Sequence, residues 1–219
     1  MQEFSLVQKI AIGVIPILFA ITLHEFAHGW VARRLGDPTA SSMGRLTVNP
    51  LAHIDPLGTI LIPLLTMMIG GFIFGWAKPV PIDPRHFQDP RRGMAWVGLA
   101  GPAANLLMAL FWTWVLSMSL NLEGMNLAVP VALMAQIGII INVILMVLNL
   151  LPIPPLDGSR VLAGIVPPDW ARNIYRIEPY GLLIIMALLF TGVLGKILWP
   201  IIQSFYGFFF QLAGLSING

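Results

Sequence analysis

The stretch His24-Glu25-Phe26-Ala27-His28 closes an apolar run, residues 5–34, that is long enough to cross a membrane. Residues four apart lie on one face of a helix, so His24 and His28 can bind one metal ion together. Glu25 lies beside them and can take a proton from water held by that metal. Ionisable groups are costly inside a bilayer and are therefore candidate functional residues there. The stretch predicts a hydrolytic metal centre within a membrane-spanning helix.

The composition indicates an integral membrane protein. Of the 219 residues, 57% are hydrophobic and 10% are charged, and the mean hydropathy is +0.83. An average soluble domain has roughly 25% charged residues. The net charge of +2 is small, and the basic residues lie in short loops rather than in a stripe, so we expect no nucleic-acid binding. The sequence contains no cysteine, so any metal must be held by His, Asp or Glu.

Hydrophobic runs separated by charged residues or proline mark the candidate membrane spans. The runs are 5–34, 57–75, 93–120, 127–151, 180–198 and 200–215. All but the last reach the roughly 17 to 25 residues that cross the hydrocarbon core. We therefore expect an all-α polytopic membrane protein with five or six transmembrane helices. The chain offers no polar stretch long enough for a soluble domain, so residues 1–219 are expected to form one membrane-embedded domain.

The basic residues constrain the orientation of these spans. Ten of the twelve gather in three places: Arg33, Arg34 and Arg45 after the first span, Lys78, Arg85, Arg91 and Arg92 before the third, and Arg160, Arg172 and Arg176 after the fourth. The positive-inside rule places all three in the cytoplasm. It places the N-terminus and the loop around Glu123, which lacks Lys and Arg, outside. His24 and His28 then lie roughly 8 to 14 Å below the cytoplasmic boundary.

This orientation requires that the run 57–75 re-enters the membrane without crossing it. Gly70, Gly71 and Gly75 allow the backbone to reverse, and non-helical backbone is tolerated at membrane depth where protein or a water-filled cavity covers it. The alternative is an ordinary spanning helix with one loop that breaks the charge rule.

Two short segments flank this run, residues 44–49 and 76–82, and we interpret both as extended. Pro79 and Pro81 restrict the second to an edge position. An edge strand beside a proteolytic centre could bind an extended peptide by β-addition. The alternative is a plain surface loop.

A catalytic zinc takes three protein ligands, so the two histidines need a third. The candidates are His53, Asp55, Asp83, His86, Glu123, Asp157, Asp169 and Glu178. Most of them lie in loops that look solvated. Asp157 differs because three prolines end the preceding span and Gly158 allows a sharp turn, which could lower the carboxylate into the membrane. The alternative is that Asp157 caps a helix.

Three motifs in this order resemble the site-2 protease family of zinc intramembrane proteases. They are His24–His28, Gly101-Pro102-Ala103-Ala104-Asn105, and the run from Asn149 to Gly158 with Leu-Asp-Gly at its end. The loop pieces 49–56 and 75–80 further resemble the compact bacterial and archaeal branch of that family. The resemblance covers about residues 15–165, the expected catalytic core. It implies that His24, His28 and Asp157 bind one zinc ion and that Glu25 is the general base.

The resemblance also implies a function. We expect a multi-pass protein of the cell membrane whose active site faces the cytoplasm. It would cut a transmembrane protein substrate within the lipid bilayer, near the cytoplasmic end of the span, to release a regulator or clear a membrane remnant. The chain has no room for the PDZ or CBS domain of larger relatives. Additional C-terminal helices in 180–215 could form a gate or only pack against lipid.

Several polar residues have two interpretations each. Asn149 could donate to the oxyanion in the active site, or make an interhelical hydrogen bond as Asn142 could. For Asn105 we favour helix packing, because Gly101, Ala103 and Ala104 form a small-residue surface. His53 and His86 lie in polar loops that explain them without a metal, although His53 could pair with Asp55 near the active site.

Three other classes of function compete with an intramembrane protease. A membrane-embedded metallopeptidase for soluble peptides would use the same zinc chemistry. A metal transporter could also place His and Asp within the membrane. A non-catalytic scaffold is disfavoured because Glu25 and all three candidate ligands are present.

Overall fold

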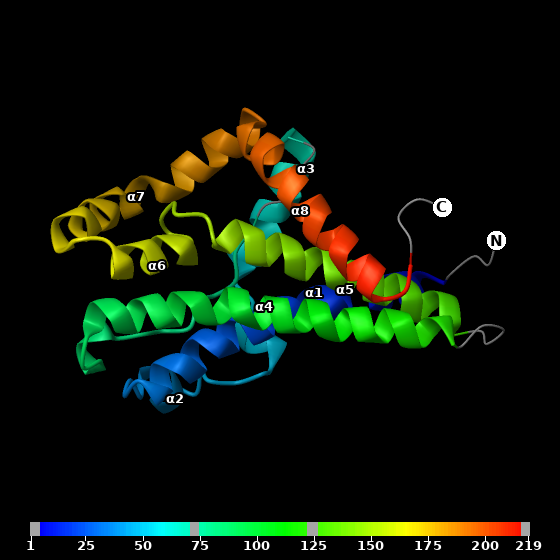
Figure 1. Ribbon diagram of the computed structural model, residues 1–219, viewed down its shortest axis with the longest axis horizontal. Coiled ribbons are helices and arrows are strands. Elements are labelled where there is room, and N and C mark those ends of the chain that lie inside the picture. The colour runs from blue at the N-terminus through cyan, green and yellow to red at the C-terminus, as the bar shows by residue number, and fades with distance from the viewer. Residues whose placement is uncertain (1–4, 71–74, 122–126, 216–219) are drawn as a thin grey trace.

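The computed structural model describes residues 5–70, 75–121 and 127–215, and within these it contains helices and no β-strand. The α-helices are α1 Leu6–Arg34, α2 Thr39–Ser42, α3 Ile62–Gly70, α4 Pro90–Leu120, α5 Ala128–Asn149, α6 Asp157–Ile165, α7 Pro168–Phe190 and α8 Val193–Leu212 (Figure 1). Five of them, α1, α4, α5, α7 and α8, are long and apolar enough to cross a membrane. The expected all-α, multi-pass membrane fold is confirmed. Gly71 and Glu123 lie outside the described residues.

The helices begin where the sequence supplies caps. Ser5 and Gln8 form a capping box at the start of α1. Asp89 accepts the N–H groups of Arg91 and Arg92 at the start of α4, and Pro90 takes the first helical position, where its missing N–H costs nothing.

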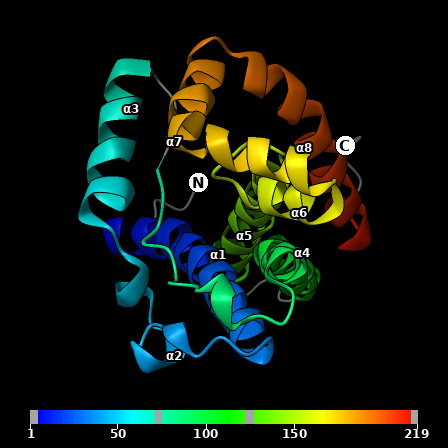
Figure 2. The same ribbon diagram turned by 90° about the vertical axis from the view of Figure 1, so that its left-hand side faces the viewer.

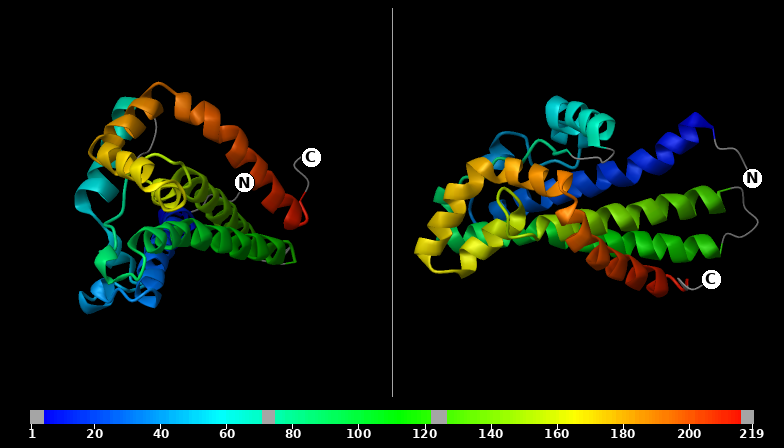
Figure 3. Two further views of the ribbon diagram at one scale, coloured as in Figure 1. Left: turned by 60° about the vertical axis from the view of Figure 1, so that its left-hand side comes forward. Right: turned by 90° about the horizontal axis from the view of Figure 1, so that it is seen from above.

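The core is a bundle of α1, α4 and α5, on which α6 and α8 pack (Figure 3). The largest fully buried side chains of the main apolar cluster come from four helices: Leu116, Ile139, Val143, Ile185 and Phe209. Small residues let the helices approach closely. At Gly138 of α5, an added Cβ would overlap the indole ring of Trp112 on α4.

The segment between α2 and α4 leaves the bundle and returns to it. A short π-helix, Pro56–Leu61, leads into α3, which stands apart from the bundle (Figure 2). Residues 76–78 then lie beside residues 53–58, where this excursion begins. The Trp76 N–H donates to Gly58 O at 3.0 Å, and the Lys78 N–H donates to His53 O at 2.9 Å. Both ends of the excursion therefore lie together, as the re-entrant interpretation requires and a spanning helix does not. Residues 44–49 and 76–82 form no regular strand.

The predicted span 180–198 is wrong in its bounds. A break at Thr191–Gly192 divides that run between α7 and α8, and Gly192 adopts a left-handed conformation with φ of 72°. The α7 helix begins earlier, at Pro168, and its first turns carry charged residues that a hydropathy pattern does not recognise as helix. Pro200 lies inside α8 rather than before it.

The long helices give the molecule two distinct ends. The α7 and α8 helices together lead from the end that holds α6 to the opposite end, where both termini lie (Figure 1). The start of α4 and the C-terminal end of α1 lie at the α6 end, and the Arg91 guanidinium donates to Val166 O there at 2.6 Å. The arginines of α1, α4 and α7 therefore gather at one end of the bundle, whereas Lys9 lies at the start of α1, near the other end.

Candidate metal centre

Three predicted ligands meet between α1 and α6. His24 Nε2 lies 3.0 Å from His28 Nε2, and each of these atoms lies 3.2 Å from Asp157 Oδ2. All three residues are buried. In the described part of the chain, no other group of three such side chains has the geometry to hold a metal ion.

The other ring nitrogen of each histidine has a fixed partner. His28 Nδ1 lies 2.7 Å from Val97 O, and His24 Nδ1 lies 2.6 Å from Asn105 Oδ1. A carbonyl oxygen can only accept a hydrogen bond, so Nδ1 of His28 carries the proton. Its Nε2 is then left with a lone pair that faces Asp157.

The orientation of the Asn105 amide fixes His24 in the same way. Asn105 Nδ2 donates to Ala20 O at 3.3 Å and to Asn142 Oδ1 at 2.9 Å. Asn142 Nδ2 donates in turn to Gly138 O at 2.8 Å. Backbone carbonyls at both ends of this chain decide which atom of each amide is nitrogen, so Asn105 presents oxygen to His24. His24 therefore also carries its proton on Nδ1.

These tautomers fit a cation. Two imidazole lone pairs and the carboxylate oxygen of Asp157 converge on one point, and Asp157 Oδ2 has no hydrogen-bond donor among the described residues. Such a cluster is repulsive unless a positive charge lies within it. Tetrahedral zinc with bonds of about 2.0 Å holds its ligand atoms roughly 3.3 Å apart, close to the distances found here. Three protein ligands would leave a fourth position for water or substrate.

Asp157 reaches the histidines because the chain breaks before α6. Leu156 is the N-cap residue and Asp157 is the first residue of the helix, so its side chain does not cap it. The positive end of the α6 dipole favours a carboxylate at this position. Arg160 Nη1 lies 3.4 Å from Asp157 Oδ1, which leaves Oδ2 to face the two histidines.

Glycines on α4 form the wall of the centre. A Cβ at Gly101 would lie 2.5 Å from both His24 Cε1 and His28 Nε2, and one at Gly98 would lie 2.9 Å from Asp157 O. Any larger side chain at Gly101 would occupy the space of the imidazoles. The small-residue surface predicted for helix packing is thus also the surface against which the ligands rest.

Glu25 is half-buried on α1 and contacts the loop before α4. Its Oε2 accepts a hydrogen bond from the Val80 N–H at 3.0 Å. The irregular segment before α4 therefore passes beside the candidate general base.

The interhelical hydrogen bond expected of Asn142 is present, because Asn142 Oδ1 accepts from Asn105 Nδ2. Asn105 joins three helices, as its expected packing role requires, and it also contacts a candidate metal ligand, His24, which was not predicted. Asn149 is half-buried and donates to Leu145 O, within its own helix, at 3.0 Å. Its role at the oxyanion stays a prediction.

His53 and Asp55 do not form the pair considered above. His53 Nε2 lies 2.9 Å from Thr47 O, while the Asp55 carboxylate caps Pro56–Leu61 through Leu57 and Gly58. The loop thus uses both residues for its own structure.

His86 contacts the fully buried carboxylate of Asp37, with 3.1 Å between Nδ1 and Oδ1. The Asp83 N–H donates to the other oxygen of Asp37 at 2.7 Å, and Thr39 donates to the first. Asp37 thereby ties the end of α1 to the loop before α4.

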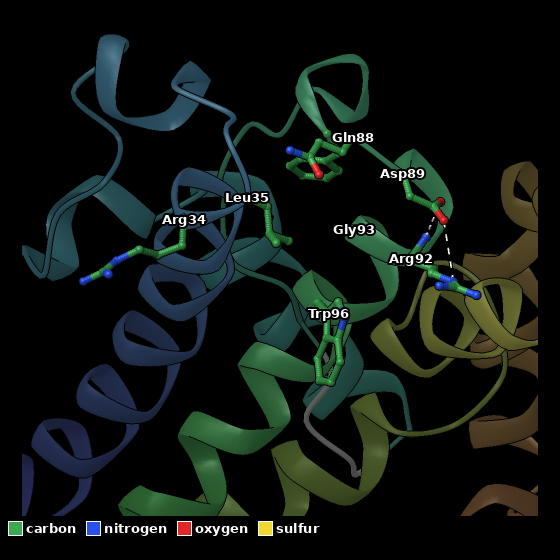
Figure 4. A pocket seen from close by; sticks show the side chains of 8 residues that line it. Arg34, Leu35, Gln88, Asp89, Arg92, Gly93 and Trp96 are labelled. Atoms are coloured by element: carbon green, nitrogen blue, oxygen red, sulfur yellow. Dashed lines mark hydrogen bonds and ion pairs between the residues drawn. The ribbon is translucent and has the colours of Figure 1, made fainter.

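Two surface hollows lie beside α1 and α4. One has a volume of about 300 Å³ and is lined by Arg34, Leu35, Phe87, Gln88, Asp89, Arg92, Gly93 and Trp96. The other, of about 620 Å³, follows the two helices past Trp30, Leu99, Ala100 and Ala103. In Figure 4, Arg92 pairs with Asp89 and Arg34 points away from the first hollow. Neither hollow is lined by Glu25 or by a candidate ligand, so neither is the reaction site.

Comparison with known proteins indicates a peptidase family. A model of peptidase family M50 matches residues 12–129. YwhC of Bacillus subtilis, described provisionally as a zinc metalloprotease, is 40% identical over 195 residues, which cover 87% of this chain and 85% of YwhC. Rip2 of Mycolicibacterium smegmatis, described in the same way, is 33% identical over 87% of this chain and 71% of Rip2.

The regulator of sigma-E protease RseP of Escherichia coli is 30% identical over 78% of this chain but only 36% of RseP. No solved structure matches the chain.

Proposed function

This chain belongs to peptidase family M50, the site-2 protease family of membrane-embedded metalloproteases, and on that premise we propose that it cuts a transmembrane segment of a membrane-protein substrate near its cytoplasmic end. His24, His28 and Asp157 would hold one zinc ion per chain, and Glu25 would be the general base. Residues 1–219 would act as one membrane-embedded protease domain with its catalytic core in 15–165.

One observation carries this proposal. Three buried ligand atoms 3.0 to 3.2 Å apart lie beside Glu25 on a helix that is apolar enough to span a membrane. A metal transporter would need ligands as well, but it would not need a carboxylate such as Glu25 next to them that binds no metal. The pairing of ligands with a neighbouring base favours hydrolysis.

The chemistry follows from the groups present. Bound zinc supplies a Lewis acid that polarises the scissile carbonyl and lowers the pKa of water toward about 7. Glu25 accepts the proton that the attacking water loses and returns it to the leaving amide nitrogen. The Nδ1–H groups of His24 and His28, held by Asn105 and Val97, keep both imidazoles turned toward the reaction centre. Asn149 is our candidate donor to the developing oxyanion.

The substrate must unwind before it can be cut. In a transmembrane helix each carbonyl is hydrogen-bonded within the helix and hidden from a nucleophile. Gly, Asn or Pro near the cut would lower the cost of local unwinding. We therefore expect such residues near the scissile bond.

The orientation is part of the proposal. The arginines of α1, α4 and α7 lie at the α6 end of the bundle, against the single Lys9 at the start of α1, and cytoplasmic loops of membrane proteins are rich in Lys and Arg. The α6 end would therefore face the cytoplasm, and water would reach the centre from that side.

Cleavage of a tagged single-span substrate in lipid vesicles by wild type and by Glu25→Gln tests this function. We expect Glu25→Gln to bind zinc as wild type does and to cut at least about a hundredfold more slowly, because a general base contributes roughly 10² to 10⁴ in rate. A soluble peptide with the same scissile sequence distinguishes the two protease functions, and wild type should cut it poorly. Equal rates for wild type and Glu25→Gln would refute the proposed mechanism.

A further inference from the structure

The hydrogen bond to Glu25 comes from an unusual place in the sequence. Val80 lies between Pro79 and Pro81, and proline has no backbone N–H. The Val80 N–H is therefore the one donor that the backbone of residues 79–81 offers. It donates to Glu25 Oε2 at 3.0 Å.

We propose that Pro79-Val80-Pro81 is a positioning element for Glu25, which holds one carboxylate oxygen still and leaves the other to take the proton from water. The inference rests on the proposed function, since it assigns a purpose to this contact in the same reaction. Val80 would touch neither substrate nor metal and would act only through Glu25.

The side chain of Val80 places its own N–H. Val80 is buried, 6% exposed, against Gly29, where an added Cβ would lie 2.9 Å from Val80 Cγ1. Gly29 lies one turn after Glu25 on the same face of α1. Val80 thus packs its side chain at Gly29 and donates its N–H to Glu25, one turn away on α1. Together these contacts restrict movement of the loop along the helix.

The rest of the segment is held independently of Glu25. The Lys78 N–H donates to His53 O at 2.9 Å, and Arg45 Nη2 donates to the carbonyls of Lys78 and Pro79 at 3.1 and 3.2 Å. Further along, the Asp83 N–H donates to buried Asp37. These contacts therefore hold the Val80 N–H in position without its hydrogen bond to Glu25.

A glutamate needs such support because its side chain has many rotamers. Among the described residues, Val80 is the one hydrogen-bond donor to Glu25. Without it, Glu25 would spread over several rotamers and spend less time in reach of the attacking water. A misplacement of about 1 Å can cost about a hundredfold in rate.

An amide-to-ester exchange tests the contact directly. Incorporating the α-hydroxy analogue of valine at position 80 of the full-length protein replaces the N–H by an oxygen atom and keeps the side chain. We expect kcat for the membrane substrate to fall at least about tenfold, with KM within about twofold and zinc content unchanged. Val80→Ala keeps the N–H but removes the side chain that packs against Gly29, so we expect it to lower kcat less than the ester does.

The matched control is the α-hydroxy analogue of alanine at position 77. An ester also weakens the carbonyl before it, which at position 80 belongs to Pro79 and binds Arg45. At position 77 the weakened carbonyl belongs to Trp76 and accepts from Thr59 Oγ1 at 2.9 Å. The Ala77 N–H makes no hydrogen bond in the described residues. Both esters weaken a hydrogen-bonded carbonyl, but only the position 80 ester loses an N–H that donates a hydrogen bond. The position 77 ester should therefore keep the kcat of wild type.

Infrared spectroscopy gives a reading that does not depend on activity. The carboxylate stretching band that disappears in Glu25→Gln should shift in the position 80 ester and not in the position 77 ester. An unshifted band, or a position 80 ester that cuts as fast as wild type, overturns the inference and leaves the proposed function standing. If the band shifts in the position 80 ester but the wild-type protein cuts no membrane substrate, the contact to Glu25 stands and the proposed function is refuted.

Discussion

Asn105 joins the three central helices through a single side-chain amide. From α4 it accepts from His24 and donates to Ala20 on α1, and it donates to Asn142 on α5. Both asparagines are fully buried. A buried amide is costly unless each of its atoms has a partner, and here each does. The same contacts set the tautomer of a candidate metal ligand.

Replacing Asn105 by Leu should therefore weaken zinc binding more than it weakens the fold. The change removes the acceptor that orients His24, and loss of such an outer partner typically costs 10- to 100-fold in metal affinity. Competition with a chromophoric chelator measures the affinity of the detergent-solubilised protein. Asn121→Leu, at the exposed end of α4, is the control. An unchanged zinc affinity in Asn105→Leu would show that His24 needs no such support.

The sequence predicted the three candidate ligands but not the residues that hold them. His24 and His28 were predictable because helical periodicity places them together, whereas for Asp157 the prolines and glycine around it left a helix cap open and the resemblance to site-2 proteases favoured a ligand. The role of Asn105 depends on which residue of another helix faces it. Asn142 and Asn149 lie seven residues apart on one face of α5. Only the packing of α4 against α5 decides that Asn142, and not Asn149, contacts Asn105.

At the scale of elements, the loop that carries Val80 is fixed to the end of α1 by Asp37. Burial raises the pKa of this carboxyl, but hydrogen bonds from Thr39 and from the Asp83 N–H, together with His86, outweigh burial and lower the pKa below its usual 3.8. Arg85 likewise lowers the pKa of Asp83 to about 2. Carboxylates with depressed pKa values stabilise the fold when they are ionised.

We therefore expect acid to loosen this loop. The stabilisation is complete above the usual pKa of 3.8 and is lost as the pH falls through the lower, folded-state value. Protection factors, which are exchange rates corrected for the intrinsic effect of pH, should be high for the amides in 76–86 at pH 6 and lower near pH 3. In Asp37→Asn these protection factors should be low at both pH values. High protection at pH 6 in Asp37→Asn would mean that other contacts hold the loop.

The turn between α7 and α8 also belongs to this scale. Gly192 has a φ of 72°, and a side chain in the left-handed region costs roughly 1 to 2 kcal/mol. Gly192→Ala should destabilise the protein by about 1 kcal/mol in thermal unfolding. Gly195→Ala is the control, because an added Cβ meets nothing within 4 Å and alanine favours helix. A Gly192→Ala protein as stable as wild type would show that the turn can relax.

Hydropathy could not reveal this turn. The hydropathy of the run 180–198 reports only that its residues are apolar. The change in chain direction depends on the backbone conformation of one residue, Gly192. That the segment 57–75 returns to its starting side was predictable because the charge rule conflicted with its hydropathy. No comparable conflict marked the boundary at Gly192.

For the whole molecule, the absence of cysteine from the sequence makes orientation measurable. Single cysteines at Ser5 and Leu212 should react with an impermeant maleimide added outside intact cells, because α1 begins and α8 ends at the end of the molecule away from α6. Cysteines at Arg92 and Asp169, whose side chains are 76% and 85% exposed at the opposite end, should react only after the cells are opened. The reverse pattern would place the catalytic centre near the outer surface.

The position of the proposed ligands along the chain has a consequence for biogenesis. His24 and His28 enter the membrane with the first helix, but Asp157 is synthesised only after residues 29–156, and the centre cannot bind its metal with three ligands before then. A nascent chain in the translocon would thus be inert toward the other newly inserted proteins around it. Activity would begin only when α6 has docked against α4, so a correctly assembled bundle would itself be the condition for proteolysis.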